Sequence, residues 1–126
     1  MNPVVLIIED NEQNLYLMRF LLEKYGFAVV EATDGIKGVE MAKKAKPHLI
    51  LLDIQLPEMD GYAVARELRK DDDLAGTAIV AVTSYAMVGD RERILEAGAD
   101  GYIEKPIDPE RFIDQIKKYI SNDRLK

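Results

Sequence analysis

Five short apolar runs recur along the chain, and polar or charged residues separate them. The clearest run is Leu49-Ile50-Leu51-Leu52, which leads directly into Asp53. Such runs are too short for a free-standing helix, and their lack of alternation is typical of strands that are covered on both faces. We therefore predict strands over residues 4–8, 27–31, 49–53, 78–82 and 100–104.

Between these runs, apolar residues recur every three or four positions, as they do on one face of a helix. The first such stretch ends at Gly26. The second lies between Asp34, a residue type that caps helices, and Pro47, which cannot continue one. The positions expected to be buried in these two helices are Leu15, Met18, Leu22 and Tyr25, followed by Ile36, Val39 and Ala42.

Three further helices are predicted in the second half of the chain. They cover residues 63–70, residues 90–97 before Gly98, and a last segment that Asp108 is expected to cap. The expected buried residues are Val64 and Leu68 in the first of these, and Ile113, Ile116 and Ile120 in the last. Because strands and helices alternate, the predicted fold class is α/β, a doubly wound (βα)5 fold with a five-stranded parallel sheet.

Composition narrows the possible functions. The 126 residues contain no linker rich in Pro, Gly or Ser, which favours one domain over residues 1–120 and a short tail at residues 121–126. A net charge of −6 disfavours binding to nucleic acid or to an anionic membrane. The absence of cysteine excludes disulfides and thiol chemistry. The apolar runs are too short to span a bilayer and no secretory signal is present, so we expect a soluble cytoplasmic protein.

Polar residues stand where the predicted strands end. They are Glu9, Asp10, Asp53, Thr83 and Lys105. In open parallel sheets, ligands bind just outside the carboxyl ends of the strands. Three carboxylates gathered there repel one another unless a cation lies among them, and a hard ion such as Mg²⁺ suits oxygen ligands. Together with an ammonium and a hydroxyl, the set indicates phosphoryl transfer, in which Asp53 can act as the nucleophile.

Other interpretations of individual acids remain open. Taken alone, Asp53 is equally compatible with a turn residue at the end of a strand. The run Asp71-Asp72-Asp73 is a weaker metal candidate, because three consecutive carboxylates do not converge easily on one ion. His48 precedes a buried strand and is interpreted as a residue of the strand start rather than as a proton shuttle.

The strand-end residues and the turns around them resemble the receiver domain of two-component response regulators. The resemblance covers about residues 3–120, and beyond the polar set it rests on Asn11, Leu56-Pro57, Met59-Asp60-Gly61, Ser84 and Pro106. It implies a flavodoxin-like or CheY-like sheet in the strand order 2-1-3-4-5. It also implies that Asp53 accepts a phosphoryl group from a histidine kinase or a phosphotransfer protein.

The same resemblance implies a role for each residue of the site. In the family, Mg²⁺ is held by an acid pair, by the phosphoacceptor, and by a backbone carbonyl two residues after the acceptor. The matching positions here are Glu9, Asp10, Asp53 and the carbonyl of Gln55. Thr83 and Lys105 would contact the phosphoryl group, and Tyr102 would be the aromatic switch that moves with Thr83. The Lys105–Pro106 peptide bond is expected to be cis.

Several longer stretches look most like the stand-alone regulators of the DivK type. These stretches are residues 9–12, 53–58, 71–75, 86–87 and 89–90. They imply a monomer or weak dimer without an output domain, which signals by docking on kinases or on another downstream protein. The expected docking surface comprises the fourth helix, the fifth strand and the fifth helix, near Tyr102 and Ile107. Gln55 and Tyr85 flank the acceptor and are expected to set how easily water reaches the phosphoryl group.

Three rival functions are considered. Phosphatases of the haloacid dehalogenase type need a second Asp two residues after the nucleophile, where this chain has Gln55. A nucleotide or flavin binder would need a glycine-rich phosphate loop, which residues 9–14 do not offer. A receiver scaffold that has lost phosphorylation is opposed by the complete set of acids, Thr and Lys. We therefore expect a phosphorylated switch that assists its own phosphorylation and dephosphorylation, and not an enzyme with a separate substrate.

Overall fold

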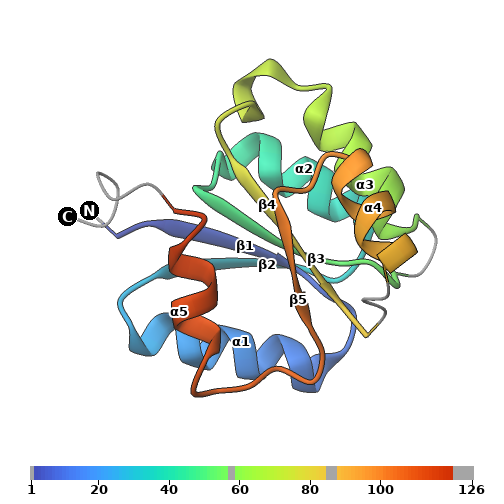
Figure 1. Cartoon of the computed structure of the whole chain (residues 1–126). Coiled ribbons are helices and arrows are strands. Elements are labelled where there is room, and N and C mark those ends of the chain that lie inside the picture. The colour runs from blue at the N-terminus through green and yellow to red at the C-terminus, as the bar shows by residue number, and fades with distance from the viewer. Residues whose placement is uncertain (1, 57–58, 85–87, 121–126) are drawn as a thin grey trace.

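The computed structural model describes residues 2–56, 59–84 and 88–120. Five parallel strands form one sheet in the order β2-β1-β3-β4-β5, which confirms the predicted fold class and strand order (Figure 1). The strands are β1 (Val4–Ile8), β2 (Ala28–Ala32), β3 (Leu49–Asp53), β4 (Ala78–Thr83) and β5 (Gly101–Glu104).

Helices cover both faces of the sheet. They are α1 (Glu12–Lys24), α2 (Gly35–Ala45), α3 (Gly61–Arg69), α4 (Val88–Glu96) and α5 (Phe112–Lys117), with one 3-10 turn, η1 (Asp72–Leu74). Helices α1 and α5 lie on one face, and α2, α3 and α4 lie on the other (Figure 1). This arrangement is the doubly wound architecture that alternating strands and helices predict.

Strand β3 is the most completely covered element of the sheet. All five of its residues are buried. Leu49 and Leu51 point into the core beneath α1 and α5, whereas Ile50 and Leu52 point into the core on the opposite face. Because side chains alternate along a strand, two helical layers require apolar residues at every position. The apolar run is therefore explained, and only Asp53 at its end is polar.

Helix termini follow the capping signals of the sequence. Asn11, Asp34 and Asp60 each accept a hydrogen bond from a backbone N–H three residues later, at 2.9, 2.8 and 2.8 Å. Gly26 and Gly98, which follow α1 and α4, adopt φ angles of +88° and +116°. Glycine adopts such angles without a steric penalty, so both residues end a helix as predicted.

Three details of the predicted helices are wrong. Tyr25 is exposed, because it follows the last residue of α1 and the helical spacing no longer fixes its direction. Ile36 is also exposed, because Gly38 brings α2 onto the sheet and Gly35 brings it onto α3. A Cβ on Gly38 would lie 2.5 Å from Ile8 Cδ1, and a Cβ on Gly35 would lie 2.6 Å from Val64 Cγ2. Asp108 does not cap α5, which begins at Phe112; its carboxylate accepts from Glu110 N in the preceding turn.

The Arg69 side chain connects several segments at the end of the sheet opposite the predicted site. Its guanidinium donates to the carbonyls of Gly98, Leu74 and Thr77 at 2.8, 3.1 and 2.9 Å. A further hydrogen bond, 2.7 Å long, reaches the Asp100 carboxylate. One side chain therefore joins α3, η1 and the segment before β5.

Within the part of the chain that the structure describes, no helix is long and apolar enough to cross a membrane.

Candidate functional site

The carboxyl ends of β1 and β3 bring three carboxylates together. Glu9 and Asp10 follow β1, and Asp53 is the last residue of β3, its neighbour in the sheet. One carboxylate oxygen from each residue lies within 4.8 Å of the others. Glu9 is 0% exposed and Asp53 is 3% exposed, whereas Asp10 lies at the surface. Two buried carboxylates and one exposed carboxylate thus form an acid cluster that opens to solvent on one side.

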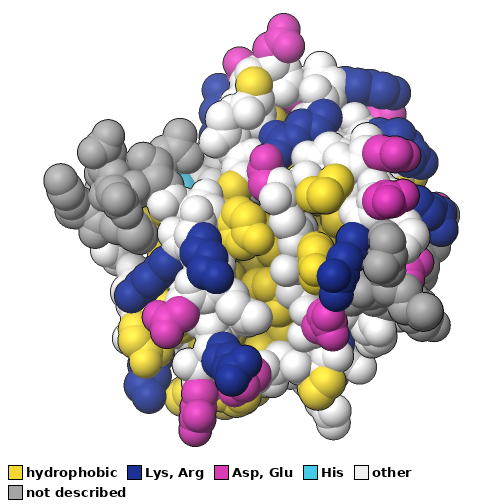
Figure 2. Space-filling model, viewed as in Figure 1, with side chains coloured by type: hydrophobic (Ala, Val, Ile, Leu, Met, Phe, Trp, Pro, Cys, Tyr) yellow, Lys and Arg dark blue, Asp and Glu magenta, His cyan; other side chains and the backbone are white. Residues whose placement is uncertain are grey.

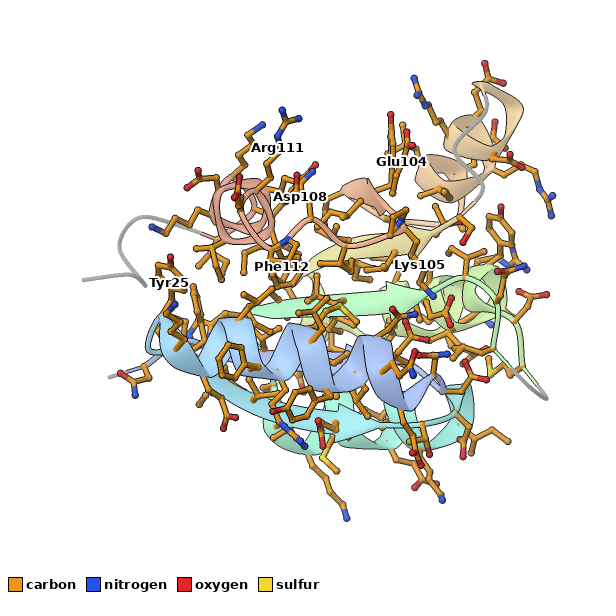
Figure 3. The ribbon with its side chains drawn as sticks, turned by 90° about the horizontal axis from the view of Figure 1, so that it is seen from below. Tyr25, Glu104, Lys105, Asp108, Arg111 and Phe112 are labelled. Atoms are coloured by element: carbon orange, nitrogen blue, oxygen red, sulfur yellow. The ribbon has the colours of Figure 1, made fainter. Side chains whose placement is uncertain are left out.

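Lys105 supplies positive charge to this acid cluster from the end of β5. Its ammonium nitrogen lies 3.0 Å from Glu9 Oε1 and 3.4 Å from Asp53 Oδ1. Figure 3 shows Lys105 at the end of the sheet where the strands terminate. The Lys105 backbone N–H donates to the Thr83 carbonyl at 2.8 Å, which fixes this residue beside the end of β4. The Lys105–Pro106 peptide bond is cis, the isomer that the family resemblance implies.

The acid cluster retains unused capacity to bind a cation. Although Lys105 Nζ is 3.0 Å away, Glu9 Oε1 makes no hydrogen bond, so this contact is an ion pair without directed geometry. Among the described residues it is the one buried side-chain oxygen in this condition. Buried polar oxygens normally have a partner, and one ammonium does not neutralise three carboxylates. The donor set, all oxygen and open to solvent, fits a hard divalent cation such as Mg²⁺.

Burial raises the pKa of Asp53 to about 6. Desolvation of the carboxylate is the largest cause, and a hydrogen bond and like charge from Glu9 add to it. Two contacts lower the pKa of Asp53 without offsetting this increase. They are the hydrogen bond that Gln55 N–H donates to Asp53 Oδ1 at 2.9 Å and the positive charge of the Lys105 ammonium. A carboxyl group that resists ionisation in this way gains from a cation placed beside it.

A cavity of about 710 Å³ opens over the acid cluster. Its lining residues are Glu9, Asp10, Asn11, Glu12, Gln13, Asn14, Asp53, Gln55, Ser84 and Lys105. Both buried acids, Lys105 and Gln55 therefore line the same cavity. Thr83 ends β4 as predicted, but its side chain is buried and does not line the cavity. Ser84, the following residue, lines it instead.

Tyr102, the expected switch residue, lies on β5 and is half-buried. The Arg91 guanidinium of α4 lies 5.2 Å from the centroid of the Tyr102 ring and 3.7 Å from Glu104 Oε1. Sequence reasoning missed Arg91, because the contact joins two elements that no local pattern connects. Tyr85 lies outside the described residues, as do Pro57, Ala86 and Met87 of the motif stretches.

The weaker candidates of the sequence have structural roles. His48 Nδ1 accepts a hydrogen bond from Val4 N at 2.9 Å, which places it at a strand start. Asp71 caps η1 by accepting from Asp73 N, and Asp73 pairs with Lys46 at 3.8 Å. Within residues 2–56, 59–84 and 88–120, the one group of three residues placed to share a metal is the acid cluster.

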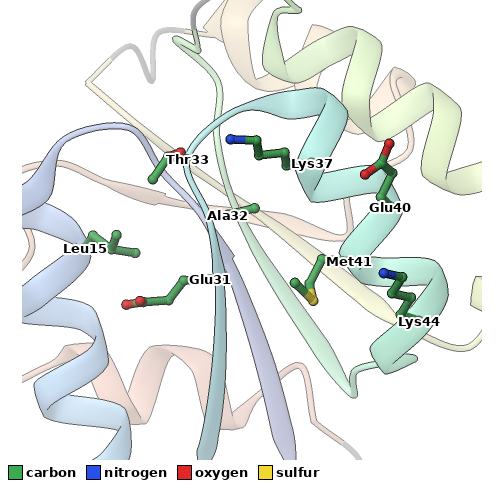
Figure 4. A pocket seen from close by; sticks show the side chains of 8 residues that line it. All are labelled: Leu15, Glu31, Ala32, Thr33, Lys37, Glu40, Met41 and Lys44. Carbon is green, nitrogen blue, oxygen red and sulfur yellow. The ribbon is translucent and has the colours of Figure 1, made fainter.

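A second cavity, of about 330 Å³, lies between α1, β2 and α2 (Figure 4). Leu15, Ala32 and Met41 contribute its apolar surface, and Lys37 and Lys44 stand at its α2 side. It shares no residue with the cavity over the acid cluster. Sequence reasoning did not anticipate this groove. Its lining includes Glu31 and Glu40, but among the described residues neither belongs to a group of three placed to share a metal.

Comparison with known proteins assigns the family. The model of the response regulator receiver domain matches residues 5–117. The chain belongs to this family. Receiver domains are the switch modules of two-component signalling, and they bind Mg²⁺ at an acidic pocket and interact with histidine kinases or phosphotransfer proteins. The position of the acid cluster at the strand ends of this receiver domain agrees with such a pocket.

Relatives of this receiver domain include response regulators that the chain matches over nearly their whole length. A polar-differentiation response regulator DivK of Brucella anthropi is 44% identical over 118 residues, which is 94% of this chain and 96% of the relative. DivK of Brucella ovis is 43% identical over 122 residues, covering 97% and 99% of the two chains.

Solved structures show the same fold. One is the receiver domain of a sensor histidine kinase from Pseudomonas aeruginosa PAO1, solved with a magnesium ion coordinated in the active site cleft. It is 32% identical to this chain, and the match covers 94% of this chain and 98% of that chain with a TM-score of 0.86. CheY4 of Vibrio cholerae has a TM-score of 0.91, covers 95% and 100% of the two chains, and at 23% identity shows the fold alone.

Proposed function

We propose that this receiver domain accepts a phosphoryl group on Asp53 from a histidine kinase or a phosphotransfer protein, with Mg²⁺ as cofactor. The observation that supports this function best is the placement of Asp53, buried at the end of β3 between Glu9 and Lys105. A buried strand fixes the carboxylate, while the cavity gives an incoming phosphoryl group access to it. We propose residues 1–120 as the receiver domain and residues 121–126 as a tail.

The residues of the site suit the demands of the transfer step. An Asp53 carboxylate oxygen forms a bond to phosphorus while the bond from phosphorus to the donor imidazole nitrogen breaks. The electron pair of that bond stays on the imidazole. The reaction needs positioning and neutralisation of charge on the phosphoryl oxygens more than covalent assistance. Lys105 supplies an ammonium next to Asp53. Thr83, at the end of the neighbouring strand, would supply a hydroxyl donor when its buried side chain moves toward the phosphoryl group.

Mg²⁺ would be held by Glu9, Asp10, Asp53 and the backbone carbonyl of Gln55. When bound, it neutralises the acids and draws the phosphoryl oxygens toward the acceptor. Glu9 Oε1, which makes no hydrogen bond, and the raised pKa of Asp53 both support this assignment, because a cation would relieve both conditions. The assisted loss of the phosphoryl group to water would use the same site, with no separate substrate.

We propose that phosphorylation switches partner binding through the surface of α4, β5 and α5. Thr83 and Tyr102 would carry the change from the site to this surface. Figure 2 shows hydrophobic side chains along the strip over β5 between α4 and α5, and Leu95 of α4 is an exposed apolar residue. Ile107, near which this surface was expected to lie, is itself buried in the core beneath α1 and α5. The readout would be docking on kinases or on another downstream protein in the cytoplasm.

Incubation with Mg²⁺ and a small phosphodonor, followed by intact-protein mass spectrometry, tests this function. We expect one acid-labile phosphate on the wild type and none on Asp53→Asn. Asp72→Asn is a matched control, because Asp72 is exposed and remote from the cavity lining, and it should be phosphorylated like the wild type. A wild type that gains no acid-labile phosphate would contradict the proposal. The phosphatase of the haloacid dehalogenase type is not favoured, since Gln55 occupies the position of its second Asp.

A further inference from the structure

The outer surface of α1 carries an exposed aromatic pair that the acid cluster does not use. Tyr16 and Phe20 are 60% and 52% exposed, and their rings stack with centroids 6.3 Å apart. Arg19 fixes this pair, because its guanidinium lies 5.7 Å from the Tyr16 ring centroid and donates to both carboxylate oxygens of Glu31 on β2. Two stacked rings exposed to solvent form a contiguous apolar patch. Such a patch indicates an interaction surface more strongly than a single exposed apolar side chain does.

Charged residues extend this aromatic pair into a ridge along α1. Glu12, Tyr16, Phe20 and Lys24 are four positions apart and exposed, so they form one row on the helix surface. We call this row the α1 ridge. Neither Glu12 nor Lys24 forms an ion pair with another described residue. The helix dipole favours an acid in the first turn and a base in the last, but it gives no reason for the aromatic pair between them.

We propose that the α1 ridge is a homodimer interface, in which α1 of one molecule pairs antiparallel with α1 of a second copy of this chain. A two-fold axis midway between Tyr16 and Phe20 would place each Glu12 opposite a Lys24 and each Tyr16 opposite a Phe20. The ridge is therefore complementary to itself in charge and in apolar surface, as a two-fold interface requires. A parallel pairing would instead oppose Glu12 to Glu12 and Lys24 to Lys24.

The size of the α1 ridge indicates a weak and reversible dimer. A helix of 13 residues is about 20 Å long, so pairing along one ridge covers on the order of 300–400 Å² per molecule. Stable complexes bury about 800 Å² per partner, so the dissociation constant should be on the order of 0.1 mM. Figure 3 shows α1 on the outside of the molecule, where no other described element covers its outer face. Dimerisation therefore needs no rearrangement of the fold.

Charge-reversal variants test both the interface and its register. Sedimentation velocity from about 10 µM to about 1 mM should show reversible dimerisation of the wild type. E12K or K24E alone places like charges opposite each other at both ends of the ridge and should weaken dimerisation roughly tenfold. The double variant E12K/K24E, and an equimolar mixture of the two single variants, restore opposite charges and should restore dimerisation.

Matched controls separate the register from general charge effects. E92K and K117E make the same charge changes at exposed positions of α4 and α5 and should dimerise like the wild type. Phe20→Lys should abolish dimerisation without changing the circular dichroism spectrum, because the residue is exposed. The proposal is overturned if the wild type stays monomeric throughout, if E12K and K24E dimerise like the wild type, or if neither the double variant nor the mixture recovers. None of these outcomes depends on phosphorylation of Asp53.

Discussion

Replacing Asp53 by Asn should stabilise the protein in the absence of divalent cations. Asp53 is buried beside Glu9, and its carboxylate makes a single backbone hydrogen bond, to Gln55 N. The amide of Asn has nearly the same shape but carries no charge, so the variant removes the cost of ionising a buried group while preserving the packing. The native residue at this position is therefore predicted to reduce stability for the sake of its chemistry.

The pKa of Asp53 sets the size and the sign of this effect. Folding raises the pKa from 3.8 to about 6, so the folded protein binds the proton more tightly than the unfolded chain does. The contribution of Asp53 to the free energy of unfolding is therefore largest below pH 4 and is lost as the pH rises to about 6. A difference of about two pH units corresponds to a loss of up to about 3 kcal/mol, since one unit equals about 1.4 kcal/mol.

Urea denaturation in EDTA at several pH values between 4 and 7 measures this difference. The free energy of unfolding of Asp53→Asn should exceed that of the wild type by up to about 3 kcal/mol at pH 7, and the gap should close toward pH 4. Mg²⁺ should then stabilise the wild type more than the variant, because it favours the charged carboxylate. Asp72→Asn, at an exposed position, should show no such gap. If the free energies of unfolding of the wild type and of Asp53→Asn change in parallel from pH 4 to pH 7, the argument from burial is refuted.

Three further substitutions probe the charge at the site, the opposite end of the sheet and the backbone beside Asp53. Lys105→Met removes the ammonium beside Asp53 and should slow phosphorylation by a small donor about a hundredfold, followed by mass spectrometry. Arg69→Ala leaves the Gly98 and Thr77 carbonyls without the guanidinium and removes one of two donors from the Leu74 carbonyl and the Asp100 carboxylate, so urea denaturation should show a loss of about 3 kcal/mol. Gly61→Ala drives a Cβ into the main chain at Ile54 and should cost about 1–3 kcal/mol and slow phosphorylation.

Each of these three variants has a matched control. Lys118→Met and Arg66→Ala change exposed residues of the same types and should leave both readouts near the wild-type values. Gly89→Ala meets no atom within 4 Å and should be tolerated. Phosphorylation of Lys105→Met at the wild-type rate would contradict the assigned role of the ammonium. Equal losses in Arg69→Ala and Arg66→Ala, or in Gly61→Ala and Gly89→Ala, would contradict the corresponding structural argument.

The sequence predicted the strands and the polar site because both depend on local patterns. An apolar run that ends in an acid specifies a buried strand and the residue at its tip, and the alternation of elements then specifies a parallel sheet. Since the carboxyl ends of neighbouring parallel strands meet, the proximity of Glu9, Asp10, Asp53 and Lys105 follows without any knowledge of contacts. The burial of Thr83, by contrast, depends on the direction of one side chain.

The features that the sequence did not predict arise from contacts between distant segments. Gly35 and Gly38 carry no apolar side chain, so hydrophobic periodicity overlooked the contacts of α2 with α3 and with the sheet and favoured Ile36 instead. In the sequence, nothing distinguishes Arg69 and Arg91 from other charged residues on exposed helix surfaces. Their partners, such as Asp100 and Tyr102, lie on other elements, and only the folded structure brings them together.

The identity of the phosphorylated residue is the most direct test of the central claim. The protein is phosphorylated with Mg²⁺ and a small donor, treated with borohydride, which reduces an acyl phosphate to an alcohol, and then mapped by peptide mass spectrometry. The account predicts that the reduced residue is Asp53 and that Asp53→Asn yields no reduced peptide. Reduction at Glu9 or Asp10 in the wild type, or at no residue, would contradict the claim that Asp53 is the phosphoacceptor.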